Sequence, residues 1–272
     1  NLTIVIDDTK NLDIIHEILH LCKKQIKILV DIDIMSIGTD GIGRTGARSF
    51  PQIISIIEYI KRSKSLKYEG VSAYAGDLQH INSYSERKRV SYDRYSYLSY
   101  IIESLKEKTF SPKIISGGGT GTHVLDINSK IFTELQPGSY IFNDLEYDAV
   151  ELDSQNKVNF ETSLFVKSTI ISSLNSNNAI LDAGIKAFSC DSKLLPKISS
   201  KSIGETNYKF FGDEHGLIEY GKKDAKIFYS GAAIELNIPH CDPTVNLYDS
   251  CHIVSDNVLI DIWPIEARGY GN

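Results

Sequence analysis

Residues 112–122 read Pro-Lys-Ile-Ile-Ser-Gly-Gly-Gly-Thr-Gly-Thr, a short apolar run that ends in a cluster of glycines. The run predicts a strand over Pro112–Ser116, and the glycines after it let the backbone approach an anion closely. Backbone N–H groups and the two threonine hydroxyls there can cradle a phosphate. Gly117–Thr122 lacks the lysine of a P-loop and the helix that follows a dinucleotide fingerprint. We interpret it as a phosphate site, and the alternative is a tight turn.

Upstream of this stretch the chain alternates between apolar runs and helical patterns, which predict the strands and helices Leu2–Asp7, Asn11–Lys23, Ile26–Ile32, Phe50–Arg62, Tyr68–Tyr74 and Tyr92–Lys106. Strands separated by helices in this way predict right-handed βαβ units and a parallel sheet that is buried on both faces. Polar clusters follow the strands at Gly38–Gly46, Ala75–His80 and Gly117–Thr122. Ligands bind at this carboxyl end of the strands in parallel α/β folds.

The number of these units predicts part of a barrel followed by a second domain. A complete eight-stranded β/α barrel takes roughly 250 residues, whereas residues 1–147 hold only four or five βα units. The chain opens directly on strand residues and its only methionine is Met35, so we expect an N-terminal truncation. Residues 148–272 predict an antiparallel β domain, because helical periodicity is nearly absent there. Its expected strands are Phe165–Ser172, Ala179–Ser189, Tyr208–Phe211, Lys226–Ile234 and Cys251–Ile262.

Composition excludes several classes of partner. The net charge of −6 argues against nucleic acid as a partner, and we interpret Glu86-Arg87-Lys88-Arg89 as a solvated helix start. No apolar stretch reaches the roughly 18–20 residues of a membrane helix, and no signal-peptide pattern opens the chain. The four cysteines form no CxxC pair, which predicts reduced thiols in a cytoplasmic protein.

Two loops after predicted strands carry side chains suited to a ligand. In Gly43-Arg44-Thr45-Gly46, which follows the second strand, the arginine can present a fixed donor to an acceptor atom. Tyr74 ends the third strand and His80 follows six residues later, so both can face the same end of the sheet. His80 is a candidate acid or base. An incidental surface arginine and an incidental loop histidine are the alternatives.

A third motif, His240-Cys241-Asp242, lies between Pro239 and Pro243. In an extended segment, residues two apart point to the same side, so the imidazole and the carboxylate can share one metal while the thiol faces away. Two protein ligands leave coordination positions for water or substrate, as a catalytic metal requires. The knot Asp213-Glu214-His215-Gly216 predicts either a turn between strands or a group that supports the metal ligands.

Taken together, these motifs resemble the metal-activated D-threonine aldolase and D-serine dehydratase family, which has the alanine racemase-like fold of pyridoxal-phosphate (PLP) enzymes. The match follows the family's order over nearly the whole chain. It consists of Gly43–Gly46, Ala73–Gly76 with Gln79 and His80, Gly117–Thr122, Glu134–Tyr140, Leu181–Gly184, Glu214–Gly216, Pro239–Leu247 and Ala267–Gly269.

The resemblance implies a cofactor site in the first domain. Arg44 would face the pyridine nitrogen of PLP, and Tyr74 would line the cofactor site. Gly118, Gly119 and Thr120, with Tyr140, would bind the cofactor's phosphate. The family's Schiff-base lysine lies in a Pro-His-x-Lys-Thr-like motif, and no such motif occurs here. We therefore assign none of the lysines to that role and expect this chain alone to lack activity.

The resemblance also implies a metal site and a base. His240 with Asp242 would hold a divalent metal, and His80 would be the base near the β-hydroxyl of a D-amino acid substrate. Family dehydratases carry Cys as the second metal ligand and aldolases carry Asp, so Asp242 implies an aldolase. A carboxylate with an imidazole suits Mn²⁺ or Mg²⁺, whereas a thiolate would favour Zn²⁺.

These roles imply a lyase that cleaves D-β-hydroxy-α-amino acids to glycine and an aldehyde. One alternative is a dehydratase that converts D-serine or D-3-hydroxyaspartate to a keto acid and ammonia. Another is a non-catalytic or decayed PLP-binding protein, because the lysine segment is absent. The family forms dimers, so we expect a homodimer.

Overall fold

The computed structural model describes residues 2–22, 24–37, 43–155, 157, 160–175, 177–200 and 203–269. Lys23 of a predicted helix and residues 38–42 of a predicted loop lie outside the described residues. The chain forms two compact units, residues 1–138 with 150–158 and residues 139–149 with 159–272. The division expected from the sequence, at residues 147 and 148, falls inside the segment that links them. Residues 139–149 belong with the second unit because they pack against the strand end at Ile238 and Pro239.

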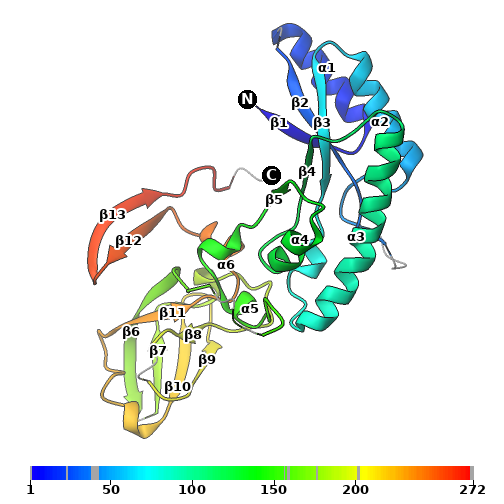
Figure 1. Cartoon of the computed structure of the whole chain (residues 1–272). Helices are drawn as coiled ribbons and strands as arrows, with labels where there is room; N and C mark the ends of the chain where they lie inside the picture. The colour runs from blue at the N-terminus through cyan, green and yellow to red at the C-terminus, as the bar shows by residue number, and fades with distance from the viewer. Residues whose placement is uncertain are drawn as a thin grey trace. The chain divides into compact units, whose positions relative to one another are not determined.

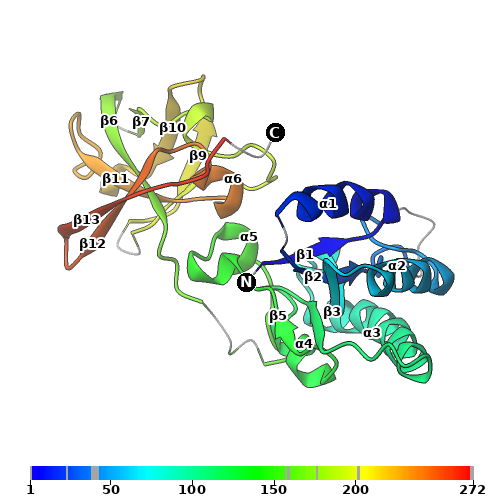
Figure 2. The same cartoon turned by 90° about the horizontal axis from the view of Figure 1, so that it is seen from above.

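The first unit is built on a parallel sheet whose five strands follow one another in chain order, β1-β2-β3-β4-β5 (Figures 1 and 2). Its elements are β1 (Thr3–Ile6), α1 (Thr9–Cys22), β2 (Ile26–Asp31), α2 (Phe50–Arg62), β3 (Leu66–Ala73), α3 (Tyr84–Glu107), β4 (Ile114–Gly117), α4 (His123–Ser129) and β5 (Glu134–Leu135). In both views α1, α2 and α3 lie along one face of the sheet. Sequential parallel strands with helices on one face are the arrangement of a β/α barrel, and the predicted fold class is confirmed.

Local sequence explains where the helices of this unit begin. The α2 bounds agree with the prediction, because Ser49 caps the first turn, Pro51 stands in that turn, and Ile53, Ile56, Ile57 and Ile60 form its buried face. The α3 helix begins at Tyr84, eight residues before the predicted Tyr92. The added turns are rich in Glu, Arg and Lys, which have high helix propensity without an apolar pattern.

One residue of the basic run at this helix start is not solvated. Arg87 is fully buried, and its guanidinium donates hydrogen bonds to the carbonyls of Ile81, Asn82 and Glu151. These contacts fasten the loop before α3 and the segment after residue 150 to the helix. The interpretation of the run as a solvated face is therefore wrong for Arg87, while Glu86 and Arg89 are exposed and paired with each other.

The second unit contains a six-stranded antiparallel sheet in the order β8-β11-β6-β7-β10-β9 and a separate β12–β13 hairpin. Its elements are α5 (Leu145–Asp148), β6 (Phe165–Asn175), β7 (Asn178–Leu181), β8 (Lys197–Ile198), β9 (Thr206–Phe210), β10 (Gly216–Tyr220), β11 (Ala233–Asn237), α6 (Cys241–Val245), β12 (Ser250–Ser255) and β13 (Val258–Pro264). The predicted antiparallel β domain is thus confirmed.

Several predicted strands in this unit differ from the observed ones. The strand expected over Ala179–Ser189 ends at Leu181, because the Asp182 carboxylate accepts hydrogen bonds from Ser168 and from the backbone N–H of Thr169. The run Lys226–Ile234 forms a strand only from Ala233 onward. The run Cys251–Ile262 is two strands that reverse at Asp256 and Asn257, both of which have positive φ.

The structure also bears on the expectations about membrane helices and cysteines. Among the described residues, no helix combines the length and apolar character needed to cross a membrane. Among the described side chains, Cys190, Cys241 and Cys251 are free thiols. The reduced state expected for all four cysteines stays a prediction, and the side chain of Cys22 lies outside the described residues.

Candidate active site

The carboxyl ends of β1, β2 and β3 border a cavity of about 430 Å³ within the first unit. Its lining is mostly polar and consists of Val5, Asp31, Met35, Arg44, Thr45, Ser72, Tyr74 and Gln136. Small-molecule sites typically have volumes of roughly 300–1,000 Å³ and a few convergent polar groups. The predicted ligand residues Arg44 and Tyr74 therefore lie together at the strand edge where the sequence predicts them.

Arg44 and Tyr74 also contact each other in this cavity. The guanidinium carbon of Arg44 lies 5.3 Å from the centre of the Tyr74 ring, which is a cation–π distance. Among the described residues that line the cavity there is no lysine. Asp31, Ser72 and Gln136 are not among the predicted site residues. Asp31 and Ser72 stand at strand ends without a motif of their own, and Gln136 lies in the matching stretch Glu134–Tyr140 without an assigned role.

The glycine turn after β4 is held together by a buried polar network. The Thr122 hydroxyl donates to Asp126 Oδ2 at 2.6 Å and accepts from Gln79 Nε2 and the Gly119 N–H at 3.1 and 3.2 Å. The Gly121 N–H donates to Gln79 Oε1 at 2.9 Å, and the Tyr95 hydroxyl donates to Asp126 Oδ1 at 2.5 Å. The Thr122 hydroxyl, expected to face a phosphate, is instead used inside the turn.

The glycines of this turn are required by close approach. Gly118 has a φ of +67°, and a side chain on it would meet Asp126 Oδ2 at 2.3 Å. A side chain on Gly121 would meet the Gln79 carbonyl oxygen at 2.0 Å. A short helix, α4, follows the turn, where none is expected from the sequence. The assignment of Gly118, Gly119 and Thr120 to phosphate binding stays a prediction.

His80 and Tyr74 differ in their surroundings. Gln79 is buried and bonded to Ala75 and to the glycine turn, whereas the neighbouring His80 is exposed. The described residues that line the cavity include Tyr74 but not His80. Tyr140 belongs to the second unit, where its ring packs on Phe160. The roles assigned to His80 and Tyr140 stay predictions.

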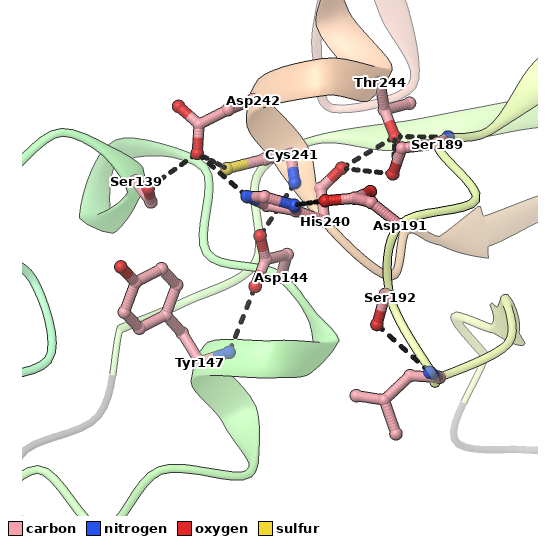
Figure 3. A network of polar contacts seen from close by, with 11 residues as sticks. Ser139, Asp144, Tyr147, Ser189, Asp191, Ser192, His240, Cys241, Asp242 and Thr244 are labelled. Atoms are coloured by element: carbon pink, nitrogen blue, oxygen red, sulfur yellow. Dashed lines mark hydrogen bonds and ion pairs between the residues drawn. The ribbon is translucent and has the colours of Figure 1, made fainter. Parts of the chain in front are cut away.

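The second unit brings His240 and Asp242 together (Figure 3). His240 Nε2 lies 3.4 Å from Asp242 Oδ2, and His240 Nδ1 lies 2.6 Å from Asp191 Oδ2. Asp242 Oδ2 also accepts a hydrogen bond from Ser139 Oγ at 3.0 Å. The Asp242 side chain is 65% exposed, so a cation from solvent can reach this corner. We call these four residues, Ser139, Asp191, His240 and Asp242, the histidine corner.

The backbone at this corner is not the extended segment that the sequence predicts. His240 is extended, but Cys241–Val245 forms the helix α6, because proline is well tolerated in a first helical turn. The Cys241 thiol consequently does not face away: it is buried and donates to Asp242 Oδ2 at 3.5 Å. The expected proximity of the imidazole and the carboxylate holds in spite of the different backbone.

Buried side chains fix the corner from behind. Asp144 is fully buried, and its carboxylate accepts from the backbone N–H groups of Cys241 and Tyr147 at 2.7 and 3.0 Å. The Thr244 hydroxyl donates to the His240 carbonyl at 2.7 Å. Asp144 therefore satisfies the first turns of both α5 and α6 and sets the position of His240.

The charges of the corner are strongly coupled. The hydrogen bond with Asp242 raises the pKa of His240 to about 9, and Asp191 contributes in the same direction against the effect of burial. The same bond lowers the pKa of Asp242 to about 2. Burial alone would raise the pKa of Asp191, but its hydrogen bond and charge interaction with His240 outweigh this and lower it. Two carboxylates thus hold one positive charge between them.

This donor set fits a divalent cation. A metal-bound histidine usually donates its other ring N–H to a carboxylate, as His240 Nδ1 does to Asp191. A cation at Nε2 would take the place of the imidazole proton there. Within the described ranges no group of three or more His, Cys, Asp or Glu side chains could hold a metal. His240 and Asp242 would therefore supply two ligands and leave the others to water or substrate.

Of the two readings of Asp213-Glu214-His215-Gly216, the structure agrees with the turn between strands. Asp213 and Glu214 lie in the turn between β9 and β10, where Lys186 pairs with them at 3.8 and 2.5 Å. Asp191 takes the supporting position instead. No local pattern marks Asp191, because it is 49 residues from His240 in the sequence.

Comparison with known proteins assigns the chain to a family. It is 33% identical over 269 residues to a D-threonine aldolase from Arthrobacter sp, an alignment that covers 99% of this chain and 68% of that protein. The chain belongs to the D-threonine aldolase family. It is also 30% identical over 272 residues to a 3-hydroxy-D-aspartate aldolase from Paracoccus denitrificans (strain Pd 1222), which covers 99% of this chain and 67% of that protein.

Family models and a solved structure agree with this membership in the D-threonine aldolase family. Residues 1–146 match the alanine racemase N-terminal domain, and residues 163–254 match the serine dehydratase domain. The crystal structure of D-threonine aldolase from Filomicrobium marinum is similar to this chain with a TM-score of 0.88 and 27% identity. That comparison covers 98% of this chain and 69% of the aldolase.

Proposed function

We propose that this chain serves a lyase that cleaves the Cα–Cβ bond of D-β-hydroxy-α-amino acids to give glycine and an aldehyde. The observation that carries the proposal is the histidine corner, in which Asp191 orients His240 and leaves Nε2 beside the Asp242 carboxylate. The two aldolase relatives are named for D-threonine and 3-hydroxy-D-aspartate. Both compounds are D-amino acids with a hydroxyl on the β-carbon.

In this proposal His240 and Asp242 hold a divalent metal. A bound divalent cation acts as a Lewis acid and lowers the pKa of a hydroxyl group that it contacts. Asp191 keeps the Nδ1 proton of His240 in place, and Ser139 donates to the Asp242 oxygen that faces Nε2. We propose Mn²⁺ or Mg²⁺ in preference to Zn²⁺, because the donor atoms are an imidazole nitrogen and a carboxylate oxygen.

The cavity of the first unit is the proposed PLP site. PLP supplies an electron sink for the bonds of an amino acid substrate. Arg44 would present its guanidinium to the cofactor's ring nitrogen, and Tyr74 would line the ring. Gly118, Gly119 and Thr120, with Tyr140, would bind the phosphate. The cavity volume and the placement of Arg44 beside Tyr74 support the fit.

His80 is the proposed base that accepts the proton of the β-hydroxyl. Its support is its place in the loop after β3, at the carboxyl end of the sheet where the cavity lies. Its side chain is exposed, so a substrate can reach it from solvent. We also propose that the protein is a cytoplasmic homodimer that acts on a small-molecule D-amino acid. The free thiols support only the cytoplasmic location.

A dehydratase is the second candidate function. The match of residues 163–254 to the serine dehydratase domain favours it, whereas a carboxylate at position 242 favours the aldolase. A third reading is a non-catalytic PLP-binding protein, which the lack of a lysine among the described cavity residues favours.

Product analysis separates these candidates. The natural protein that carries this chain, incubated with D-threonine, PLP and Mn²⁺, should release acetaldehyde and glycine in equal amounts. Keto acid and ammonium would instead identify a dehydratase, and no product would favour the non-catalytic reading. Asp242→Ala and His80→Ala should each lower aldehyde release by about 100-fold or more. If both variants kept full activity, the assigned roles would be wrong.

A further inference from the structure

The turn that carries Arg44 is fastened to the end of β2 by Asp31. The Thr45 hydroxyl donates to Asp31 Oδ2 at 2.7 Å, and the Ala47 N–H donates to the Asp31 carbonyl at 2.9 Å. The residue between them, Gly46, donates its N–H to Asp7 Oδ2 at 3.1 Å. Three consecutive residues after Arg44 are thus bound to the ends of two neighbouring strands.

Asp31 itself is held firmly at this position. It is paired with Ser72 across the β2–β3 ladder, and both residues line the cavity with Arg44 and Thr45. Burial raises the pKa of Asp31 and nearby Asp7 adds to this effect, while hydrogen bonds with Thr45 and Ser72 and the charge of Arg44 oppose it. The carboxylate is therefore a partly buried acceptor whose hydroxyl donors stabilise its charged form.

We infer that Asp31 and Thr45 are positioning residues of the cavity site, which hold Arg44 so that its guanidinium faces a bound ligand. The identity of that ligand as PLP rests on the proposed function. Arg44 and Thr45 are both exposed, so without the Asp31 bond the long arginine side chain would have to be ordered when the ligand binds. Ordering a loop and an arginine side chain on ligand binding costs conformational entropy and weakens affinity. The hydrogen bond between Thr45 and Asp31, which exists before the ligand binds, removes part of this entropic cost.

A purely structural role predicts a different outcome, because it would affect binding without regard to Arg44. A double-mutant cycle between Thr45 and Arg44 therefore tests the inference. The probe is pyridoxine 5′-phosphate, which has the ring and phosphate of the cofactor but no aldehyde. Its affinity for the natural protein is measured by isothermal titration calorimetry in Thr45→Val, Thr45→Ser, Arg44→Gln and the Arg44→Gln/Thr45→Val pair.

We expect Thr45→Val to weaken binding by about tenfold, the order expected for a lost hydrogen bond to a charged group. Thr45→Ser keeps the hydroxyl and should bind as the unchanged protein does. In the Arg44→Gln background, Thr45→Val should have no further effect. Asp31→Asn should weaken binding in the same direction as Thr45→Val, and Thr206→Val, a strand threonine of the second unit, is the matched control that should change nothing.

Equal weakening by Thr45→Val with and without Arg44 would overturn the inference, and so would no weakening at all. Failure of the unchanged protein to bind the probe would instead overturn the proposed cofactor site, on which the inference depends. Thermal unfolding of each variant shows whether it is folded. If Asp31→Asn unfolds, the Thr45→Val and Thr45→Ser pair, on an exposed side chain, still decides the matter.

Discussion

The glycine turn after β4 and the histidine corner are both rich in polar groups. The polar side chains of the turn are buried, whereas the carboxylates of the corner are exposed. In the glycine turn, Gln79, Thr122 and Asp126 are buried and bond to one another and to the turn's own backbone. In the histidine corner, Asp191 and Asp242 flank His240 and stay largely exposed. The polar side chains of the turn thus find hydrogen-bond partners within the turn. In the corner, two carboxylates that contact the same imidazole remain accessible to solvent.

The difference shows which carboxylates remain available to a cation. A buried carboxylate that accepts hydroxyl hydrogen bonds, such as Asp126, stabilises the fold and offers little to a ligand. An imidazole that lies between two carboxylates can lose its proton and bind a cation in its place. We therefore expect mutations in the turn to change stability and mutations in the corner to change metal binding.

The largest expected effect is at Asp242. Replacing Asp242 by Ala removes one of the two proposed protein ligands, so Mn²⁺ affinity should fall by more than about 100-fold, beyond the loss typical of a supporting residue. Isothermal titration calorimetry with Mn²⁺ measures it. Asp256→Ala, in the exposed β12–β13 turn, is the matched control and should leave the affinity unchanged. Equal Mn²⁺ affinity in both variants would contradict the metal assignment.

The next effect is on stability and lies in the glycine turn. Asp126→Ala leaves the hydroxyls of Tyr95 and Thr122 buried without their acceptor, so the free energy of unfolding should fall by about 3 kcal/mol. Urea unfolding measures it, and the Mn²⁺ affinity of the folded variant should not change. A stability equal to that of the unchanged protein would show that the network does not hold the turn.

Asp126 also gives a pH dependence. Burial raises its pKa above the ordinary value of 3.8, although the bonds with Thr122 and Tyr95 oppose the shift. The folded state thus holds this proton more tightly than the unfolded state. The contribution of the protonated Asp126 to the free energy of unfolding is therefore present at low pH and is lost as the pH rises through the folded-state pKa. Relative to Asp126→Asn, which mimics the protonated acid, the unchanged protein should lose stability as the pH rises above the ordinary carboxyl pKa of 3.8. A difference that is constant with pH would contradict this.

A smaller effect is expected at Asp191. Asp191→Asn keeps the shape of the side chain but removes the charge that holds the Nδ1 proton of His240. Loss of such a supporting carboxylate typically lowers metal affinity by about 10–100-fold. Titration with Mn²⁺ measures this loss of affinity. Asp191→Glu keeps the carboxylate and should retain part of the Mn²⁺ affinity that Asp191→Asn loses. An affinity equal to that of the unchanged protein would mean that Asp191 does not orient the ligand.

The smallest effect is expected at Glu214. In the described contacts its exposed carboxylate pairs with Lys186, and exposed pairs contribute little to stability. Glu214→Gln should change neither the urea midpoint nor the Mn²⁺ affinity measurably. A clear loss of metal affinity would show that the β9–β10 turn supports the metal site.

Much of the fold follows from local sequence. In β2 the successive residues Ile28, Leu29 and Val30 are all buried, as expected for an apolar strand covered on both faces. The α2 helix carries its cap, its proline and its apolar stripe within 14 residues, Ser49–Arg62. The start of α3 was missed because Arg87 stabilises it through carbonyls outside the helix. The α6 helix was missed because prolines around His240 are compatible with both extended backbone and a first helical turn.

The candidate site was predictable to a smaller extent. Arg44, Tyr74, His240 and Asp242 stand in short motifs at element ends, so their residue types and spacing suggest a ligand. Asp31 and Asp191 carry no such motif, and Ser139 lies in the matching stretch Glu134–Tyr140 without a role assigned to it. Only the folded chain brings these residues to Thr45, His240 and Asp242. Whether a polar side chain turns inward, as Thr122 does, depends on partners such as Asp126 and Gln79 and cannot be read from the glycine cluster.

The most direct test of the metal site is a crystal of the natural protein soaked in Mn²⁺, with anomalous diffraction data collected near the manganese edge. We predict an anomalous peak between His240 Nε2 and the Asp242 carboxylate, with Asp191 still bonded to Nδ1. Peaks confined to other exposed carboxylates, or no peak at this corner with Mn²⁺ well above its dissociation constant, would contradict it.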